Sequence, residues 1–198
     1  MTMKNDPSMT GLNYNRIKND AYFTIEPWVT EEAMKVMIEY DLIPKNVDDE
    51  FDVWEPACGI GLMSEIISEY GFRVFNSDLT DWGYGEVSNF HDYDHLRANT
   101  IITNPPYGDG AEPFIRHALS LSPDCAAFLL RNEWDCARKR NDLFSKQDDP
   151  HFSMKIVLQK RPRWFEKKKG DAGPRHNYSW YIWSKNPDIR NRVVYIAP

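Results

Sequence analysis

The chain has 198 residues, of which 41% are hydrophobic, and it carries a formal net charge of −6. This length fits one domain with a hydrophobic core and excludes two full-sized domains. No apolar run approaches the roughly 18 residues of a membrane span, and the first ten residues lack the apolar stretch of a signal peptide. Three cysteines without metal-binding spacing, Cys58, Cys125 and Cys136, indicate a reducing environment. We therefore expect a cytoplasmic protein with no membrane contact and no metal.

The acidic charge by itself argues against a nucleic-acid partner, because affinity for a polyanion comes largely from Lys and Arg. The charge is unevenly distributed, however. Residues 155–175 contain eight basic and two acidic residues, a local charge of +6 against −12 for the rest of the chain. This basic segment keeps nucleic acid among the candidate partners.

The hydrophobic periodicity begins after a polar leader, residues 1–20, and predicts a single domain over residues 21–198. A helix over 30–43 opens with Thr30 and has an apolar face made of Ala33, Met34, Met37 and Ile38. A strand at 51–56, a glycine turn, a helix at 62–71 and a strand at 72–79 form a parallel βαβ unit. Further strands are predicted at 100–103, 124–130, 154–162 and 177–183, with helices at 112–121 and 134–146. This alternation predicts an α/β domain with helices on both faces of a mostly parallel sheet.

The glycine turn at residues 55–61 follows the first strand of that unit, where Gly59 and Gly61 let the backbone approach a ligand closely. Asp78 ends the next strand, 19 residues after Gly59, where a carboxylate reaches ribose hydroxyls. Ser64 replaces the third glycine of a pyrophosphate loop, which favours a mononucleoside-type cofactor over a dinucleotide. A purely structural turn with a helix-capping acid is the alternative.

The tetrapeptide Asn104, Pro105, Pro106 and Tyr107 directly follows the strand at 100–103. Two prolines remove two amide donors and stiffen the chain, so the Asn104 amide oxygen and the Pro105 carbonyl are presented as fixed acceptors for an amino group. Tyr107 offers a ring on which a planar substrate can stack. The alternative is a structural Pro-Pro turn with a packed tyrosine.

These motifs resemble those of the S-adenosylmethionine-dependent amino methyltransferases, most closely the small DNA adenine N6-methyltransferases of phages and prophages. The sequence EPACGIG is similar to their first motif, Asp78 to the ribose-binding acid, and NPPY to the catalytic motif. The segment 20–27 is similar to the one that closes over the methionine end of the cofactor. The resemblance covers roughly residues 20–185 and implies a Rossmann-like class I methyltransferase fold with a seven-stranded sheet.

The resemblance also implies roles for individual residues. S-adenosylmethionine would be bound by Tyr22, Thr24, Pro27, Glu55, Cys58, Gly59, Gly61, Asp78, Asp92 and Tyr93, and Asn104, Pro105, Pro106 and Tyr107 would be catalytic. Trp164 or Phe165 would lie against the flipped base, and Arg161, Arg163, Lys167 and Lys168 would contact phosphates. The alternatives are aromatic side chains that cover a sheet edge and a solvated, charged strand extension.

The implied reaction is methyl transfer to the N6 amino group of adenine in DNA, with the base flipped out of a duplex or taken from a single strand. No separate target-recognition domain is predicted, so a recognition subunit or a homodimer is a possible partner, and the setting would be the cytoplasm of a bacterial or phage-infected cell. A protein glutamine or ribosomal RNA is the alternative substrate. A non-catalytic subunit that binds the cofactor beside a recognition protein is the third hypothesis.

Overall fold

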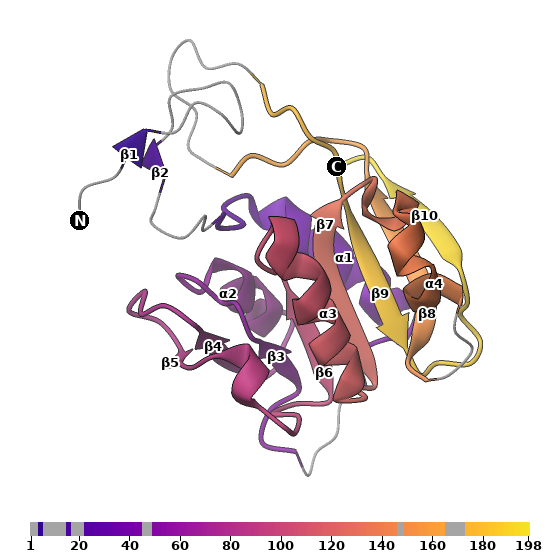
Figure 1. The fold of residues 1–198 in the computed structure, drawn as a ribbon, viewed down its shortest axis with the longest axis horizontal. Coiled ribbons are helices and arrows are strands. Elements are labelled where there is room, and N and C mark those ends of the chain that lie inside the picture. The colour runs from indigo at the N-terminus through magenta and orange to yellow at the C-terminus, as the bar shows by residue number, and fades with distance from the viewer. Residues whose placement is uncertain (1–3, 6–14, 17–21, 45–48, 146–148, 165–172) are drawn as a thin grey trace.

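The computed structural model describes residues 4–5, 15–16, 22–44, 49–145, 149–164 and 173–198. In this part of the chain eight strands form one sheet in the order β10-β8-β9-β7-β6-β3-β4-β5 (Figure 1). Its strands are β3 (Val53–Glu55), β4 (Val74–Asp78), β5 (Glu86–Val87), β6 (Thr100–Thr103), β7 (Cys125–Arg131), β8 (His151–Leu158), β9 (Tyr178–Ser184) and β10 (Arg192–Ile196). β9 is antiparallel to β7 and β8, and the other pairs are parallel. Two short strands, β1 (Lys4–Asn5) and β2 (Asn15–Arg16), pair separately.

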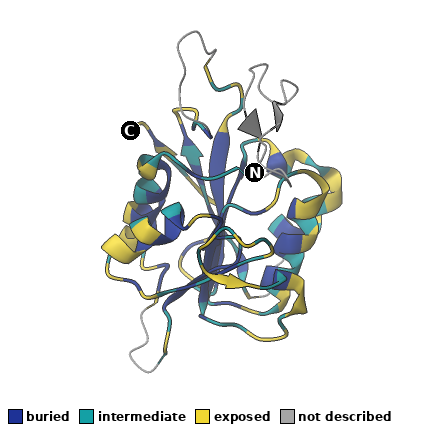
Figure 2. Ribbon diagram, turned by 90° about the vertical axis from the view of Figure 1, so that its left-hand side faces the viewer, coloured by how far each residue is buried: buried dark blue, intermediate teal, exposed yellow. Residues whose placement is uncertain are grey.

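The helices cover both faces of the sheet, which Figure 2 shows as a buried layer between partly exposed helices. They are α1 (Pro27–Glu39), α2 (Leu62–Glu69), α3 (Ala111–Ser120) and α4 (Asn141–Ser145), with the 3-10 turns η1 (Phe90–Asp92), η2 (Gly108–Gly110), η3 (Trp134–Cys136) and η4 (Arg138–Arg140). One core cluster joins α1 and α2 to the sheet and includes Met34 and Ile67. The other joins α3 to the opposite face and includes Phe114 and Phe128. The α/β class with a mostly parallel sheet is confirmed, with eight strands in the described residues instead of seven.

The central strands are apolar on both faces because helices cover both faces. All four residues of β6 are buried, as are all seven of β9. β3, β4, β6 and β7 run parallel, so their carboxyl ends meet at one edge of the sheet. The glycine turn, Asp78 and the Asn104 turn all follow these ends and are thereby brought together.

The predicted start of the first helix was wrong by one turn. α1 begins at Pro27, whose ring fixes a helical φ and whose missing N–H is not needed at the first helical position. Thr30, predicted to open the helix, lies inside it and is buried. Ile38, predicted for the apolar face, is 45% exposed near the end of the helix.

The predicted helix over 134–146 is confirmed only at α4, because residues 134–140 fold as the 3-10 turns η3 and η4. Ala137 is extended between the two 3-10 turns. Asp135 accepts hydrogen bonds from Lys155 Nζ at 2.7 Å and from the Tyr181 hydroxyl at 3.1 Å, which hold the first turn on the sheet. Arg140 stacks on the Trp134 ring at 4.2 Å. These tertiary contacts outweigh the helical periodicity of the segment.

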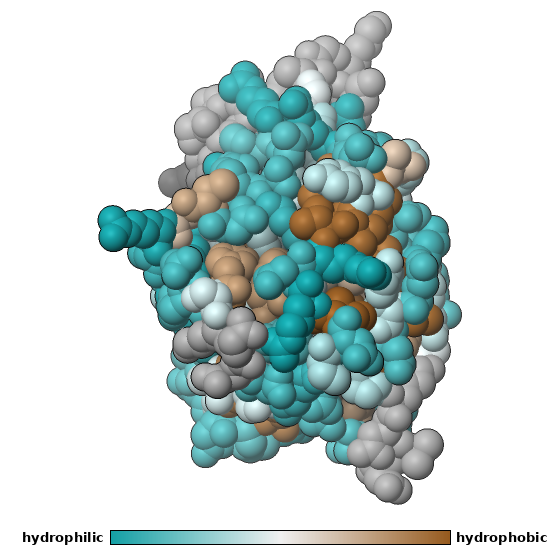
Figure 3. Space-filling model, turned by 90° about the vertical axis from the view of Figure 1, so that its right-hand side faces the viewer, coloured by the Kyte–Doolittle hydropathy of each residue, from teal (hydrophilic) through white to brown (hydrophobic). Residues whose placement is uncertain are grey.

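β10, which the sequence analysis missed, forms one edge of the sheet beside β8. Val193 and Tyr195 are 49% and 65% exposed, which explains why the segment lacks the signature of a buried strand. On this side of the molecule, apolar patches interrupt a mostly hydrophilic surface (Figure 3). Among the described residues no helix is long and apolar enough to cross a bilayer.

Candidate active site

A cavity of about 430 Å³ opens at the carboxyl edge of the parallel strands. Its lining comes from residues 22–23, the glycine turn, residues 78–82 after β4, residues 89–91 around η1, and the segment 104–114. A volume of this size is in the range of small-molecule sites. The predicted glycine turn, Asp78 and Asn104 turn therefore share one cavity.

The glycine turn needs its two glycines for both conformation and space. Gly59 and Gly61 have φ values of +55° and +87°, in the left-handed region. A Cβ at Gly59 would lie 2.6 Å from the Phe23 ring, and one at Gly61 would lie 2.4 Å from the Tyr84 ring. Cys58, directly before Gly59, is buried, and burial raises the pKa of its thiol to about 12. The turn is thus closely covered by two aromatic side chains.

Asp78 organises the end of β4 through three donors. Its Oδ2 accepts from the Gly59 N–H at 2.9 Å. Its Oδ1 accepts from the Thr80 N–H at 2.9 Å and from Trp82 Nε1 at 3.1 Å. A carboxylate has about four acceptor positions, so Asp78 retains capacity for a ligand hydroxyl that enters the cavity it lines.

Glu55 is a buried carboxyl group, 2% exposed, at the end of β3. Ser64 Oγ is in hydrogen-bonding contact with both Glu55 Oε2 and Asn76 Oδ1. Ser64 has a single hydrogen to give and cannot donate to both oxygens at once, whereas a protonated Glu55 that donates to Ser64 lets Ser64 donate to Asn76. Burial raises the Glu55 pKa to about 8. Both the contacts and the burial favour the neutral form of Glu55, which lines a second, smaller cavity together with Thr24 and Cys58.

Asn104 presents a free acceptor. Its Nδ2 donates to the Tyr22 carbonyl at 2.9 Å and to Thr24 Oγ1 at 3.2 Å. Its Oδ1 is buried and accepts no hydrogen bond of good geometry among the described residues, and Asn104 lines the large cavity. The Tyr107 hydroxyl is also buried without such a bond, and it interacts with the Asn104 side chain. Unpaired buried polar groups are costly, so both groups would gain from a ligand that hydrogen-bonds to them.

Tyr107 belongs to a cluster of aromatic rings. Its ring centroid lies 5.4 Å from that of Tyr22, 6.0 Å from that of Trp164 and 5.9 Å from that of Tyr178. Burial raises the pKa of the Tyr107 hydroxyl well above its ordinary value. Trp164, predicted to lie against a flipped base, is 7% exposed. Its ring packs against the rings of Tyr178, at 4.8 Å, and Tyr107, at 6.0 Å.

A second aromatic group forms the opposite wall of the cavity. Phe90 and Phe114 have ring centroids 4.3 Å apart, and His117 lies edge-on to Phe90 at 4.9 Å. His91 also lines the cavity, and burial together with the neighbouring His117 lowers its pKa. This wall offers apolar and aromatic surface suited to a planar ring.

Four residues predicted for the cofactor site line neither cavity: Pro27, Gly61, Asp92 and Tyr93. Pro27 is exposed at the start of α1. Asp92 is exposed and accepts from Asn89 at 3.0 Å, and Tyr93 packs against Trp54 at 4.8 Å. Around η1, residues 89–91 line the cavity and residues 92–93 do not.

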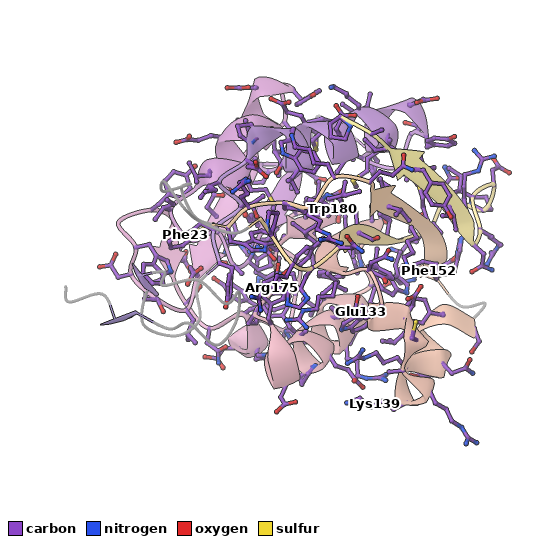
Figure 4. The ribbon with its side chains drawn as sticks, turned by 90° about the horizontal axis from the view of Figure 1, so that it is seen from above. Phe23, Glu133, Lys139, Phe152, Arg175 and Trp180 are labelled. Carbon is purple, nitrogen blue, oxygen red and sulfur yellow. The ribbon has the colours of Figure 1, made fainter. Side chains whose placement is uncertain are left out.

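The basic segment is only partly described. Phe165, Lys167 and Lys168 lie outside the described residues. Arg161 donates to Asn177 Oδ1 at 2.9 Å, and the Arg163 N–H donates to Glu26 Oε2 at 2.8 Å. Lys155, counted with this segment, is instead a partly buried member of β8 that pairs with Asp135. Arg175 is exposed, and in Figure 4, which looks down on the molecule from above, it is labelled between Phe23 and Glu133.

Sequence reasoning missed several lining residues, namely Phe23, Trp82, Asn89, His91 and Phe114. Phe23 lies inside the segment singled out for the cofactor, and Trp82 follows Asp78 by four residues, so proximity in sequence was the available signal. In the described part of the chain no cluster of His, Cys, Asp and Glu has the arrangement of a metal site.

Comparisons with known proteins identify the fold. No family model and no curated protein matches the sequence. Among solved structures, magnesium protoporphyrin IX methyltransferase from Synechocystis PCC 6803 with bound SAM matches with a TM-score of 0.53 and 13% identity over 83% of this chain and 79% of that one. Human methyltransferase 10 domain containing protein matches with 0.52 and 12% identity over 91% of each chain. The DrdV–DNA complex matches with 0.55 and 11% identity over 88% of this chain and 27% of that one. The chain therefore has the fold of class I methyltransferases.

Proposed function

We propose that the protein transfers a methyl group from S-adenosylmethionine to the N6 amino group of adenine in DNA. The observation that carries this proposal is the buried, unpartnered Oδ1 of Asn104 beside the large cavity. Two prolines follow it, so this acceptor is surrounded by few competing backbone donors. An amino group, with its two N–H bonds, is the ligand chemistry that such an acceptor selects.

The residues of the cavity fit the proposed cofactor. Asp78 retains acceptor capacity for a ribose hydroxyl at the end of β4, the position at which nucleoside-type ligands are held in this kind of fold. Phe90, His91 and Phe114 supply the aromatic wall for an adenine ring. Glu55 lines the adjoining small cavity and would face the polar end of the cofactor. Solved neighbours of the fold carry this cofactor, among them the Synechocystis enzyme with bound SAM.

In the proposed reaction the protein positions the two reactants and stabilises the charges that change during methyl transfer. S-adenosylmethionine supplies an electrophilic methyl group on a positively charged sulfur. The adenine amino nitrogen is a poor nucleophile because its lone pair is delocalised into the ring. Hydrogen bonds from its N–H groups to Asn104 Oδ1 and the Pro105 carbonyl favour the pyramidal nitrogen that attacks. The N–C bond forms as the S–C bond breaks, and the amino proton leaves afterwards to solvent.

The proposed substrate class rests on the amino-accepting turn and on the charge distribution. Tyr107, supported by Tyr22 and Trp164, would stack on a base that has left the duplex. Arg175 is exposed and is available for phosphate contact. A solved neighbour of the fold is a complex with DNA. Phe165, Lys167 and Lys168 are proposed to extend this contact surface.

The test is methyl transfer from tritiated S-adenosylmethionine to three separate acceptors: unmethylated plasmid DNA, total RNA and soluble cell protein. We expect label in DNA, recovered after nuclease digestion as N6-methyldeoxyadenosine. Label confined to protein or RNA would assign the enzyme to the alternative substrates. Absence of label in all three, with the cofactor bound in a separate titration, would favour a cofactor-binding subunit.

Two variants connect the activity to the proposed site. Asn104→Ala removes the acceptor and is expected to lower kcat by about 100-fold or more, in line with the loss of a preorganised hydrogen bond in an active site. Thr30→Val, a change at a buried threonine of α1 outside the cavity, is the control. If Asn104→Ala methylates DNA as well as the wild type does, the proposed role of this turn is wrong.

A further inference from the structure

The orientation of the Asn104 side chain is set by the segment 22–24. The Tyr22 carbonyl and Thr24 Oγ1 both accept from Asn104 Nδ2, at 2.9 and 3.2 Å. Thr24 is 7% exposed, so water does not easily replace its hydroxyl. The two hydrogens of the amide nitrogen are thereby used inside the protein, and the oxygen is left for a ligand.

The direction of the amide matters because its two ends have opposite hydrogen-bonding character. If the amide of Asn104 turned over, its oxygen would face the Tyr22 carbonyl oxygen, and its NH2 group would replace the acceptor beside the cavity. A site with that arrangement would repel an amino group. The Tyr22 carbonyl can only accept and therefore opposes this flip, while the Thr24 hydroxyl adds the second bond that holds the amide in the productive position.

The residue between the two anchors contacts the glycine turn. The Phe23 ring lies against Gly59 so closely that a Cβ there would be 2.6 Å away. It also meets the Trp82 ring edge-on at 5.3 Å, and Trp82 donates to Asp78. The segment 22–24 therefore contacts Asn104 through Tyr22 and Thr24, and it contacts the glycine turn through Phe23. The contact with the glycine turn fixes the positions of the Thr24 hydroxyl and the Tyr22 carbonyl.

We propose that Thr24 is a positioning residue, whose hydroxyl holds the Asn104 amide with its oxygen directed to the target amino group. This role differs from contact with the cofactor, which the sequence resemblance implies for Thr24. The inference rests on the proposed function only in taking Asn104 as the acceptor. The orientation of the amide is a property of the protein alone and is measurable without any substrate.

The first experiment is NMR of the protein labelled with ¹⁵N-asparagine, with the Asn104 side-chain signal assigned by its loss in Asn104→Ala. In the wild type we expect slow exchange of the Asn104 amide hydrogens with water. In Thr24→Val, which keeps the shape and removes the hydroxyl, we expect faster exchange and a shifted signal, whereas Thr24→Ser should restore the wild-type behaviour. Unchanged exchange in Thr24→Val would overturn the proposal, whatever the substrate of the enzyme proves to be.

The second experiment is kinetic and uses unmethylated plasmid DNA. Thr24→Val should lower kcat by about 10- to 100-fold, because misplacing a reacting group by a fraction of an ångström is costly, with KM for both substrates little changed. Thr24→Ser should recover most of kcat. Thr30→Val, the same change at a buried threonine of α1 outside the site, should leave kcat unchanged. A raised KM for the cofactor at unchanged kcat would assign Thr24 to cofactor binding and contradict the positioning role. If DNA is not a substrate, the proposed function fails while the NMR result still decides the role of Thr24.

Discussion

The buried carboxyl group of Glu55 makes the stability of this protein depend on pH in a definite direction. Glu55 is 2% exposed, and burial raises its pKa from 4.5 to about 8. Glu55→Gln is the informative change, because a glutamine amide donates to Ser64 as the protonated acid does but does not titrate. The variant therefore reproduces the neutral form of the site at every pH.

The sign follows from proton binding in the two states. Below pH 4.5 the carboxyl group is protonated in both the folded and the unfolded chain, and the contribution of the neutral group is fully present. Between pH 4.5 and 8 the unfolded chain loses the proton while the folded chain keeps it, so the free energy of unfolding falls as the pH rises. At about 1.4 kcal/mol per pKa unit, the shift corresponds to a loss of up to about 5 kcal/mol across this window.

The assay is urea-induced unfolding of the wild type and of Glu55→Gln at intervals from pH 4 to pH 9. The difference between their free energies of unfolding removes the contributions of other titrating groups. We expect wild type to lose stability relative to the variant as the pH rises. Glu65→Gln, the same change at an exposed carboxylate of α2, is the control for the substitution itself. Parallel curves for wild type and Glu55→Gln would refute the conclusion that Glu55 is a neutral acid.

Three further predictions concern the turn, the core and the cofactor site. Gly59→Ala should lower the free energy of unfolding by about 2 kcal/mol or more, since its φ is +55° and the added Cβ meets the Phe23 ring, and an unchanged urea midpoint would contradict this. Trp54→Phe removes the 2.9 Å hydrogen bond from Nε1 to the buried Ser77 hydroxyl and should cost about 1 to 3 kcal/mol by thermal unfolding, whereas a loss near zero would mean that Ser77 finds another partner. Asp78→Ala should weaken S-adenosylmethionine binding by about 10- to 100-fold in calorimetric titrations, and unchanged affinity would exclude Asp78 from the cofactor site.

The elements that the sequence predicted well are those whose signal is local. The βαβ unit from β3 to β4 has apolar strands, a glycine turn and an acid at the end of the second strand. Each of these features is set by residues that are close together in the sequence. β6 has two central isoleucines and β7 is almost entirely apolar. Short apolar runs of this kind are typical of strands that are covered on both faces. The glycine turn, Asp78 and Asn104 lie close together because they follow the carboxyl ends of the parallel strands β3, β4 and β6.

The errors arise where distant parts of the chain decide the local structure. Residues 134–140 have helical periodicity, but Lys155 and Tyr181 on the sheet hold Asp135 and break the helix into turns. β10 is a strand because it pairs with β8, while its own residues are largely exposed. Neither cause is visible in a window of ten residues.

In the candidate site, the polar residues were predicted from the sequence more completely than the apolar residues that line the cavity. Asn104 and Asp78 stood out because their residue types carry chemistry, whereas Phe23, Trp82 and Phe114 become lining residues only through tertiary packing. Trp164 was predicted to lie against a flipped base from its place in a basic segment, and the structure packs it, 7% exposed, beside Tyr178. The orientation of the Asn104 amide depends on Tyr22 and Thr24, about eighty residues away, and required the structure.

The central claim is that the free acceptor at Asn104 receives the N6 amino group of adenine in DNA. The most direct test supplies S-adenosylmethionine with a trideuterated methyl group and unmethylated DNA, followed by mass spectrometry of the released nucleosides. The account predicts trideuteromethyl label on the N6 nitrogen of deoxyadenosine with wild-type protein and its near absence with Asn104→Ala. Label on cytosine, label only in RNA or protein, or equal labelling by Asn104→Ala would contradict it.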